Sequence, residues 1–228
     1  MFLAAFSQLP VIVRTVTELN SAIVSQLDES SALASARETA LHNDLTPLSP
    51  IATSLVTMVA RLARVSNAVV ISDSAAVASL AIGHGITEGG VVTLINAQPE
   101  IVEHTRTTFK TENLPCVQLR PITGLPLEVF GRLADDSYDL VLVEDMYDKM
   151  GIFVEESARL LRAGGLLVLP NSLADGNFLE MMDPSLATSA ADEAAIAATT
   201  LAEMLEESAD FTAYRLPIDL GMTIAVRN

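Results

Sequence analysis

The amino-acid sequence predicts an α/β fold with a doubly wound, mostly parallel seven-stranded sheet that ends in an antiparallel C-terminal hairpin. Short apolar runs rich in β-branched residues alternate with segments of helical periodicity, which is the pattern of parallel strands covered by helices on both faces. Half of the 228 residues are hydrophobic and 18% are charged, so the chain can bury a sizeable core. We expect a single domain over residues 1–228, with a helical extension at 1–66 and a sheet-containing core at 67–228.

The N-terminal extension has the spacing of amphipathic helices. Residues 11–40 carry apolar side chains at helix-like intervals with a junction at 28–31, and residues 51–65 repeat the pattern. Pro47 and Pro50 exclude a continuous helix through the loop between them. The apolar start of the chain lacks a basic region and a cleavage site, so we expect a packed segment there and not a signal peptide.

The stretch at residues 67–98 predicts the first β-α-β unit of the core. It reads as a strand, a Ser-Asp-Ser turn, a helix of small residues and a second strand, at 68–71, 72–74, 75–82 and 91–95. We expect Gly83 and Gly85 to end the helix, because glycine is a poor helix former. The carboxyl ends of such strands and the N-terminus of the crossover helix meet at one crevice, where open α/β sheets bind ligands.

The rest of the chain continues this alternation. We expect helices at 100–110, 125–133, 152–161 and 192–207, and strands at 117–119, 138–143 and 166–169. The Ala-Gly-Gly at 163–165 should turn the chain between helix and strand, and residues 177–190 have no regular pattern. The segments 211–217 and 222–227 predict the antiparallel hairpin that closes the sheet.

The composition argues against nucleic-acid and membrane partners. The chain carries 29 acidic and 13 basic residues, a formal net charge of −16, and such a surface repels phosphate backbones. It has no tryptophan for base stacking, and no apolar run reaches the roughly 20 residues of a membrane helix. The single cysteine, Cys116, fits a reducing compartment. We therefore expect a cytoplasmic protein without nucleic-acid or membrane partners.

Three segments carry a resemblance to a known family. They are SYDLVLVE at 137–144, ARLLRAGGLLVLPNSLADG at 158–176 and RLPIDLGMTIAV at 215–226. In order and spacing they resemble the class I S-adenosylmethionine-dependent methyltransferases, and among these the catechol-type, cation-dependent O-methyltransferases of a bacterial, actinobacterial branch. The resemblance covers residues 25–228, including a Thr-Pro at 46–47 before the core. It implies a Rossmann-like methyltransferase fold, S-adenosylmethionine as cofactor, a small hydroxylated acceptor and a homodimer as one assembly state.

The motifs of the cofactor loop depart from the family pattern. Ile71 stands where the family has an acidic residue, and its three glycine positions are occupied by Asp73, Ala75 and Val77. At a left-handed backbone position alanine costs about 1–2 kcal/mol. Asn96 replaces the acid that holds the ribose hydroxyls, and neutral hydrogen bonds are roughly half as strong as charged ones. We therefore expect weakened cofactor binding, which glycine at positions 73 and 75 should improve.

The resemblance assigns candidate roles to named residues. The candidate cofactor contacts are Leu45, Ile71, Asp73, Ser74, Ala75, Ser79, Asn96 and Glu144. The hydroxyls of Ser74 and Ser79 suit the methionine end of the cofactor, and helix capping explains them equally well. Glu144 is the candidate catalytic residue, which deprotonates or orients the acceptor hydroxyl. The alternative for Glu144 is a solvated loop carboxylate.

The resemblance also implies a metal site, which we expect this chain to lack. The family's ligands are an Asp after one strand and an Asp-Asn pair after the next, and Glu144, Pro170 and Asn171 stand at these positions. Pro170 offers no side-chain oxygen, whereas Mg²⁺ requires hard oxygen ligands in near-octahedral geometry. Asp145 or Asp175 is available as a further carboxylate, but nothing in the spacing requires it.

Three functional interpretations remain open. The leading one is an O-methyltransferase that holds S-adenosylmethionine and a small acceptor in position for in-line transfer. The altered loop at 71–77 and Pro170 also fit a pseudo-methyltransferase that serves as a binding or dimeric scaffold, because a fold does not fix a function. The third is a relative that binds another nucleotide-like ligand in the same crevice.

Overall fold

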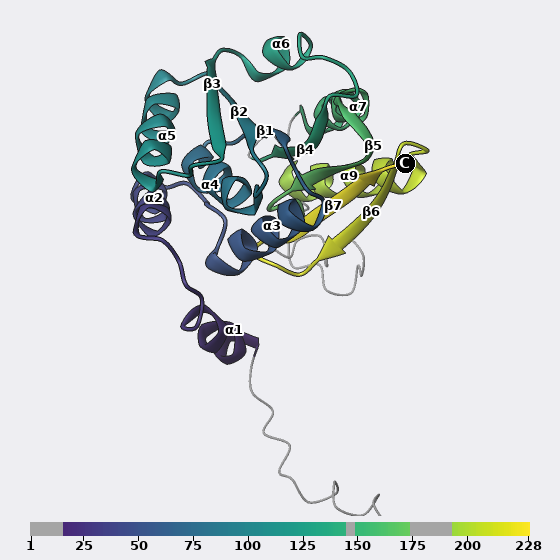
Figure 1. Ribbon diagram of the computed structural model, residues 1–228. Helices are drawn as coiled ribbons and strands as arrows, with labels where there is room; N and C mark the ends of the chain where they lie inside the picture. Colours follow the sequence, from purple (N-terminus) through teal and green to yellow (C-terminus); the bar gives the residue numbers. More distant parts are fainter. Residues whose placement is uncertain (1–15, 145–148, 174–192) are drawn as a thin grey trace, which may run out of the picture.

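The computed structural model describes residues 16–144, 149–173 and 193–228, and Figure 1 shows their arrangement. The helices are α1 (Val16–Val24), α2 (Ser31–His42), α3 (Pro50–Leu62), α4 (Ala75–Gly85), α5 (Pro99–Glu112), α6 (Pro126–Phe130), α7 (Met150–Leu160) and α9 (Glu193–Glu207). The strands are β1 (Asn67–Ile71), β2 (Gly90–Asn96), β3 (Val117–Thr123), β4 (Tyr138–Val143), β5 (Leu161–Leu169), β6 (Phe211–Leu216) and β7 (Met222–Arg227).

The strands form one seven-stranded mixed sheet in the order β3-β2-β1-β4-β5-β7-β6. The five strands from β3 to β5 are parallel, and β7 runs antiparallel to both of its neighbours, β5 and β6. The chain leaves β1 toward β2 on one side and later returns to β4 on the other. This reversal is a topological switch point at the carboxyl ends of β1 and β4, the position at which open α/β sheets generally bind ligands. The predicted doubly wound sheet with its C-terminal hairpin is confirmed.

Helices cover both faces of the sheet (Figure 1). On one face α2, α3, α4 and α5 share a core that contains Val70 and Leu80. On the other face α6, α7 and α9 share a core that contains Ile71, Phe130 and Phe153. The rings of Phe130 and Phe153 meet edge to face with centroids 5.5 Å apart, which is a favourable aromatic geometry. Because Val70 and Ile71 face opposite cores, β1 is buried on both sides, as its apolar run predicts.

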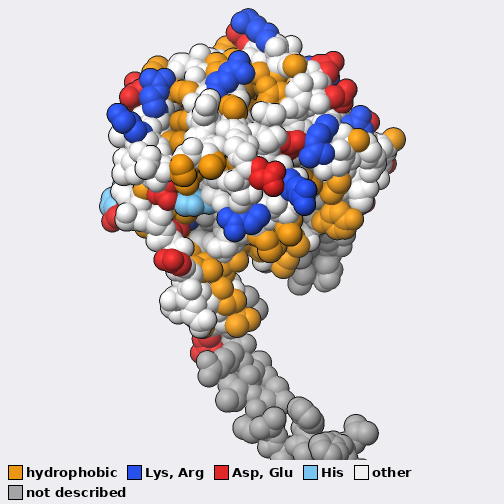
Figure 2. Space-filling model, in the orientation of Figure 1, with side chains coloured by type: hydrophobic (Ala, Val, Ile, Leu, Met, Phe, Trp, Pro, Cys, Tyr) orange, Lys and Arg blue, Asp and Glu red, His pale blue; other side chains and the backbone are white. Residues whose placement is uncertain are grey.

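Helix α1 stands apart from the sheet, and an extended segment joins it to α2 (Figure 1). Its Leu19 and Ile23 side chains are 55% and 40% exposed, and Met58 and Leu62 of α3 are exposed as well. Figure 2 shows hydrophobic side chains gathered where α1 adjoins the rest of the molecule. The expected packed N-terminal segment and the patternless stretch at 177–190 lie outside the described residues.

Within the residues that the structure describes, no helix has the length and apolar character needed to cross a membrane. The one described cysteine, Cys116, is exposed and forms no disulfide.

Helix α4 runs through the two glycines that were expected to end it. It continues to Gly85, and both glycines lie where α4 contacts other helices. A Cβ on Gly83 would lie 2.7 Å from the Leu114 side chain, and one on Gly85 would lie 2.6 Å from the Ala60 Cβ. The expectation was wrong because tight packing against α3 and the end of α5 offsets the low helix propensity of glycine.

Three other boundaries differ from the sequence expectation. Strand β5 begins at residue 161, so the predicted turn at 163–165 lies inside a strand with a register shift against β4. Strand β3 continues to Thr123 despite Pro121, because β3 is an edge strand and Pro121 needs no donor toward an outer neighbour. Helix α6 spans only residues 126–130, about one turn, where a longer helix was expected.

A buried carboxylate ties β1 to β4 at the edge opposite the crevice. Asp139 accepts hydrogen bonds from the backbone N–H groups of Ser66 and Asn67 at 2.7 and 2.8 Å, and from the Ser66 hydroxyl at 2.9 Å. Arg162 of β5 completes the set with an ion pair. Burial raises the pKa of the Asp139 carboxyl, but the hydrogen bonds from Arg162, Asn67 and Ser66 outweigh it and hold that pKa below its ordinary value.

Candidate functional site

The polar residues that follow the parallel strands meet at the carboxyl edge of the sheet. Ser72 follows β1, Asn96 ends β2, Glu144 follows β4 and Asn171 lies two residues after β5. Each is at most 3% exposed. Buried polar groups need hydrogen-bond partners, and these four residues supply several of those partners to one another.

Glu144 is fully buried and held in place. Its Oε2 accepts a hydrogen bond from the Ser72 hydroxyl at 2.7 Å, and its Oε1 accepts one from Asn171 Nδ2 at 3.3 Å. Its backbone N–H donates to the carbonyl of Ile71 at 2.9 Å. The alternative of a solvated loop carboxylate is therefore wrong. Glu144 is a buried carboxylate that hydrogen bonds hold at the switch point between β1 and β4.

Asn96 connects the end of β2 to the loop after β1. Its side-chain NH₂ donates to the Ser72 carbonyl at 3.0 Å and to Asp73 Oδ1 at 2.9 Å. Its Oδ1 accepts a hydrogen bond from the Gln98 N–H at 2.8 Å. Asn96 therefore orients the Asp73 carboxylate, and its own amide groups are engaged within the protein.

Ser74 and Ser79 are buried without hydrogen-bond partners. Their side chains are 3% and 0% exposed, and neither hydroxyl has a partner among the described residues. Ser74 precedes α4 but makes no capping hydrogen bond, and Ser79 lies in the middle of that helix. Ser79 is therefore not a cap residue, whereas Ser74 occupies the N-cap position of α4 without a side-chain capping hydrogen bond. A buried hydroxyl without a partner carries a desolvation penalty.

The cofactor loop does not have the backbone that the sequence analysis assumed. Asp73, Ala75 and Val77 all have negative φ, and α4 already begins at Ala75. The expected cost of 1–2 kcal/mol for a left-handed alanine therefore does not arise, and the expected gain from glycine at positions 73 and 75 loses its basis. Ile71 is fully buried in the core, so only its backbone reaches the crevice.

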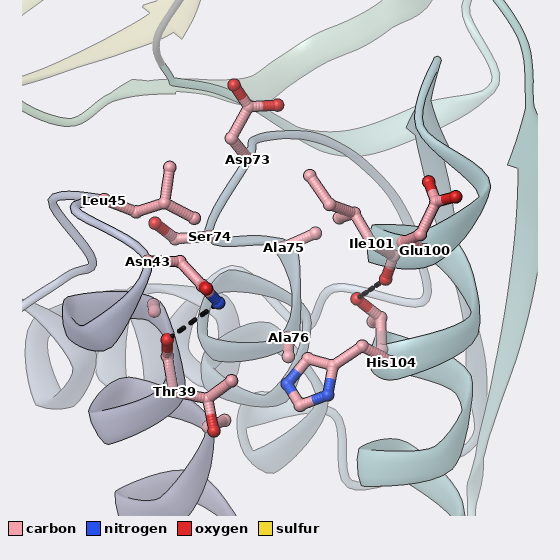
Figure 3. Close-up of a pocket in the computed structure, with 13 residues that line it drawn as sticks. Thr39, Asn43, Leu45, Asp73, Ser74, Ala75, Ala76, Glu100, Ile101 and His104 are labelled. Atoms are coloured by element: carbon pink, nitrogen blue, oxygen red, sulfur yellow. Dashed lines mark hydrogen bonds between the residues drawn. The ribbon is translucent and has the colours of Figure 1, made fainter.

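A cavity of about 270 Å³ opens beside this loop, between α2, α4 and α5 (Figure 3). Four of the candidate cofactor residues line it: Leu45, Asp73, Ser74 and Ala75. The other lining residues, which the sequence analysis did not single out, are Ala36, Thr39, Ala40, Asn43, Ala76, Glu100, Ile101, His104 and Thr105. Ile71, Ser79, Asn96 and Glu144 do not line it. The i, i+1, i+4 spacing of Glu100, Ile101 and His104 marks one helix face, but the sequence offers no sign that α2 lies opposite.

The loop that carries Leu45 is fixed by a buried arginine. Arg37 of α2 donates its Nε to the Leu48 carbonyl at 2.7 Å and an NH₂ group to the Thr53 hydroxyl at 2.9 Å. The same guanidinium pairs with Glu29. These contacts connect α2, α3 and the loop that carries Leu45.

The residues at the implied metal site form an incomplete donor set among the described residues. Glu144 and Asn171 meet directly, with the amide of Asn171 acting as a donor to the carboxylate, while Pro170 supplies no ligand atom. Within residues 16–144, 149–173 and 193–228, no three His, Cys, Asp or Glu side chains form a metal-binding group. Asp145 and Asp175 lie outside the described residues. Among the described residues this position therefore offers one carboxylate and one amide, without the second carboxylate that the resemblance implies at Pro170.

Comparison with known proteins agrees with this architecture. A family model described as O-methyltransferase matches residues 22–228. A provisionally named O-methyltransferase of Mycobacteroides abscessus is 30% identical over 202 residues, which is 89% of this chain and 91% of that protein. A crystal structure from Corynebacterium glutamicum has 26% identity and a TM-score of 0.83, covering 92% of this chain and 96% of the other.

A further crystal structure, the O-methyltransferase TomG of Streptomyces achromogenes, shares the fold with a TM-score of 0.78 at 19% identity, covering 92% of this chain and 96% of TomG. The family model spans the whole sheet, the loops at its carboxyl edge and the closing hairpin. This protein therefore belongs to the O-methyltransferase family and is a class I methyltransferase.

Proposed function

We propose that this protein transfers the methyl group of S-adenosylmethionine to the hydroxyl of a small acceptor molecule. The observation that carries the proposal is the buried Glu144 carboxylate, which Ser72 and Asn171 hold at the switch point of an O-methyltransferase fold. Two solved structures of similar fold support S-adenosylmethionine as the cofactor. TomG was solved in complex with S-adenosylmethionine, and an O-methyltransferase from Bacillus cereus was solved in complex with S-adenosylhomocysteine. No comparison favours the scaffold alternative.

The chemistry requires positioning and one proton transfer. S-adenosylmethionine supplies a methyl group activated by its sulfonium. The crevice holds the acceptor oxygen in line with that group. Glu144 accepts the hydroxyl proton while the oxygen–methyl bond forms and the sulfur–methyl bond breaks. Ser72 and Asn171 fix the carboxylate for this step, because each donates to one of its oxygens.

The test is a transfer assay with the full chain, methyl-labelled S-adenosylmethionine and a panel of catechols, phenols and aliphatic alcohols. We expect a labelled methyl ether and one equivalent of S-adenosylhomocysteine, detected by mass spectrometry. Tight binding of the cofactor without transfer to any acceptor would instead favour the scaffold interpretation.

We expect S-adenosylmethionine to bind with a dissociation constant of about 1 μM or weaker, which corresponds to about 8 kcal/mol of binding free energy. The physical reason is that Ile71 and Asn96 supply no charge at two positions where the resemblance expects acids, and neutral hydrogen bonds are weaker than charge-assisted ones. Titration calorimetry with S-adenosylmethionine and S-adenosylhomocysteine measures both constants. Nanomolar binding would contradict this account.

We propose that methyl transfer does not depend on a divalent ion. The expected result is equal activity with and without EDTA, and no stoichiometric metal in the purified protein by elemental analysis. The reason is the incomplete donor set of Glu144, Pro170 and Asn171. Pro170→Asp adds the missing carboxylate and should create measurable metal affinity. Loss of activity in EDTA that Mg²⁺ restores would overturn the prediction.

We also propose a single-domain cytoplasmic protein that forms a homodimer. The exposed apolar side chains of α1 and α3, among them Leu19 and Leu62, support an interface. Light scattering coupled to size-exclusion chromatography measures the mass in solution, and a monomer at micromolar concentration would contradict the dimer.

A further inference from the structure

We propose that a cavity at the amino ends of the parallel strands binds a small phosphate monoester that carries hydroxyl groups. The cavity has a volume of about 580 Å³, within the roughly 300–1,000 Å³ of small-molecule sites. Asn67, Thr93, Gln118, Arg120 and Tyr138 contribute to its lining. The proposal does not depend on methyl transfer, because it rests on the position, the charge and the hydrogen-bonding state of these residues.

Three neighbouring strands place polar side chains on one face of the sheet at this cavity. Asn67 of β1 pairs in register with Val91 of β2, and Val91 pairs with Gln118 of β3. Two residues further along the strands, Thr93 pairs with Arg120. Side chains two residues apart on a strand share a face of the sheet. These residues therefore form two adjacent rows that cross the strands, and the rows are largely polar.

The same face becomes apolar where helix α6 covers it. The next row pairs Ile95 of β2 with Ile122 of β3, and both side chains belong to the core that contains Leu127 and Phe130 of α6. Helix α6 spans only residues 126–130, so at a rise of 1.5 Å per residue it is about 7.5 Å long. It covers the apolar row and leaves the polar rows at the amino ends of the strands open to a ligand.

Arg120 gives the cavity a positive charge. Among the described residues, no aspartate or glutamate lines the cavity, and the exposed Arg120 side chain has no ion pair or hydrogen bond. Arg106 and Arg159, in contrast, pair with neighbouring acids. A guanidinium binds a phosphate group through two parallel hydrogen bonds. Because the chain has a net charge of −16, its overall field repels anions, so anion binding requires such a local arrangement.

The neutral polar side chains suit the hydroxyl groups of the ligand. The side-chain amides of Asn67 and Gln118 are exposed and form no hydrogen bonds with other described residues. Each amide offers both donors and an acceptor, and a hydroxyl group can use either. Thr93 and Tyr138, which also line the cavity, each carry a hydroxyl group. A sugar phosphate combines the charge and the hydroxyl groups that this lining can bind.

The cavity is separate from the proposed site of methyl transfer. Asn67 begins β1, whereas Ile71 ends it and accepts a hydrogen bond from the backbone N–H of Glu144. The four residue steps between Asn67 and Ile71 rise about 3.3 Å each, so the two edges of the sheet lie about 13 Å apart along β1. Saturating S-adenosylmethionine should therefore leave binding at the cavity unchanged.

Ligand-observed NMR on the full chain measures the binding of glucose 6-phosphate. Glucose, which lacks the phosphate, and inorganic phosphate, which lacks the sugar hydroxyls, are the matched controls. We expect a dissociation constant of about 1 mM or below for glucose 6-phosphate, a normal value for a ligand of this size, and binding about fivefold weaker or less for each control. Arg120→Gln should weaken glucose 6-phosphate about tenfold, and Gln118→Ala should weaken it about threefold.

Arg106→Gln is the control variant. It removes the same charge from α5, which covers the opposite face of the sheet, and Arg106 does not line the cavity. Thermal unfolding checks that each variant stays folded. Glucose or inorganic phosphate binding as tightly as glucose 6-phosphate overturns the proposal, and so does unchanged binding in Arg120→Gln. Failure of the proposed function looks different: S-adenosylmethionine then neither binds nor donates its methyl group, while glucose 6-phosphate binding persists.

Discussion

Glu144→Gln should lower kcat for methyl transfer by about 10²–10⁴-fold, the range that a positioned general base contributes. Glutamine preserves the volume of the side chain and still accepts a hydrogen bond from Ser72, so the crevice keeps its shape. It cannot take a proton from the acceptor hydroxyl. We therefore expect the loss to fall on kcat, while the dissociation constant of S-adenosylhomocysteine changes by less than about threefold, or 0.7 kcal/mol.

Two further variants serve as comparisons for Glu144→Gln. Glu88→Gln removes an exposed acid before β2 and should leave kcat unchanged. Ser72→Ala removes the 2.7 Å hydrogen bond that orients Glu144, so it should lower kcat less than Glu144→Gln does. If Glu144→Gln transfers methyl groups at the original rate with intact thermal stability, Glu144 is a structural residue and the proposed base is wrong.

Asp139→Ala should lower the free energy of unfolding by about 2–3 kcal/mol at pH 7. The carboxylate accepts three hydrogen bonds from Ser66 and Asn67 and pairs with Arg162, and hydrogen bonds to charged groups contribute roughly 1.5–3 kcal/mol each. Water replaces some of these bonds in the variant because Asn67 is exposed, so the contributions do not add in full. Urea denaturation of the full chain measures the change, and exposed Glu128→Gln is the control.

This stabilisation should depend on pH with a defined sign. The pKa of Asp139 is lower in the folded protein than its ordinary value, because the hydrogen bonds from Arg162, Asn67 and Ser66 outweigh burial. The unfolded chain therefore binds the proton more readily. The contribution of Asp139 is fully present above the unfolded pKa of about 3.9 and is lost as the pH falls through the folded pKa. The difference between the original protein and Asp139→Asn should shrink below pH 4 and stay constant between pH 6 and 8.

Local sequence patterns were sufficient to predict the strands of the sheet. The β-branched runs at 68–71 and 138–143 became β1 and β4 with shifts of one residue or none, because strands buried on both faces need continuous apolar runs. The closing hairpin followed for a similar reason. The predicted ends of helices and strands at glycines and prolines were less accurate. The packing at Gly83 and the edge position of Pro121 involve residues distant in the sequence.

Sequence position also located the ends of the strands that build the crevice. Asn96 and Glu144 were singled out because they follow strands, and parallel strands bring their carboxyl ends together. Their partners did not follow from the sequence. Ser72 and Glu144 are 72 residues apart along the chain, and Arg37 reaches Leu48 and Thr53 from within a helix that reads as an ordinary amphipathic segment.

The sequence by itself therefore determined the fold class, the order of the strands along the chain and the edge of the sheet at which Asn96 and Glu144 lie. Only the tertiary structure decided that Asp73 is held by Asn96, that Ser74 faces a cavity and that no left-handed residue is needed in the loop at 73–77. The physical reason is that backbone periodicity and burial are local properties of the chain. Hydrogen-bond partners and cavities arise between segments that only the folded sheet brings together.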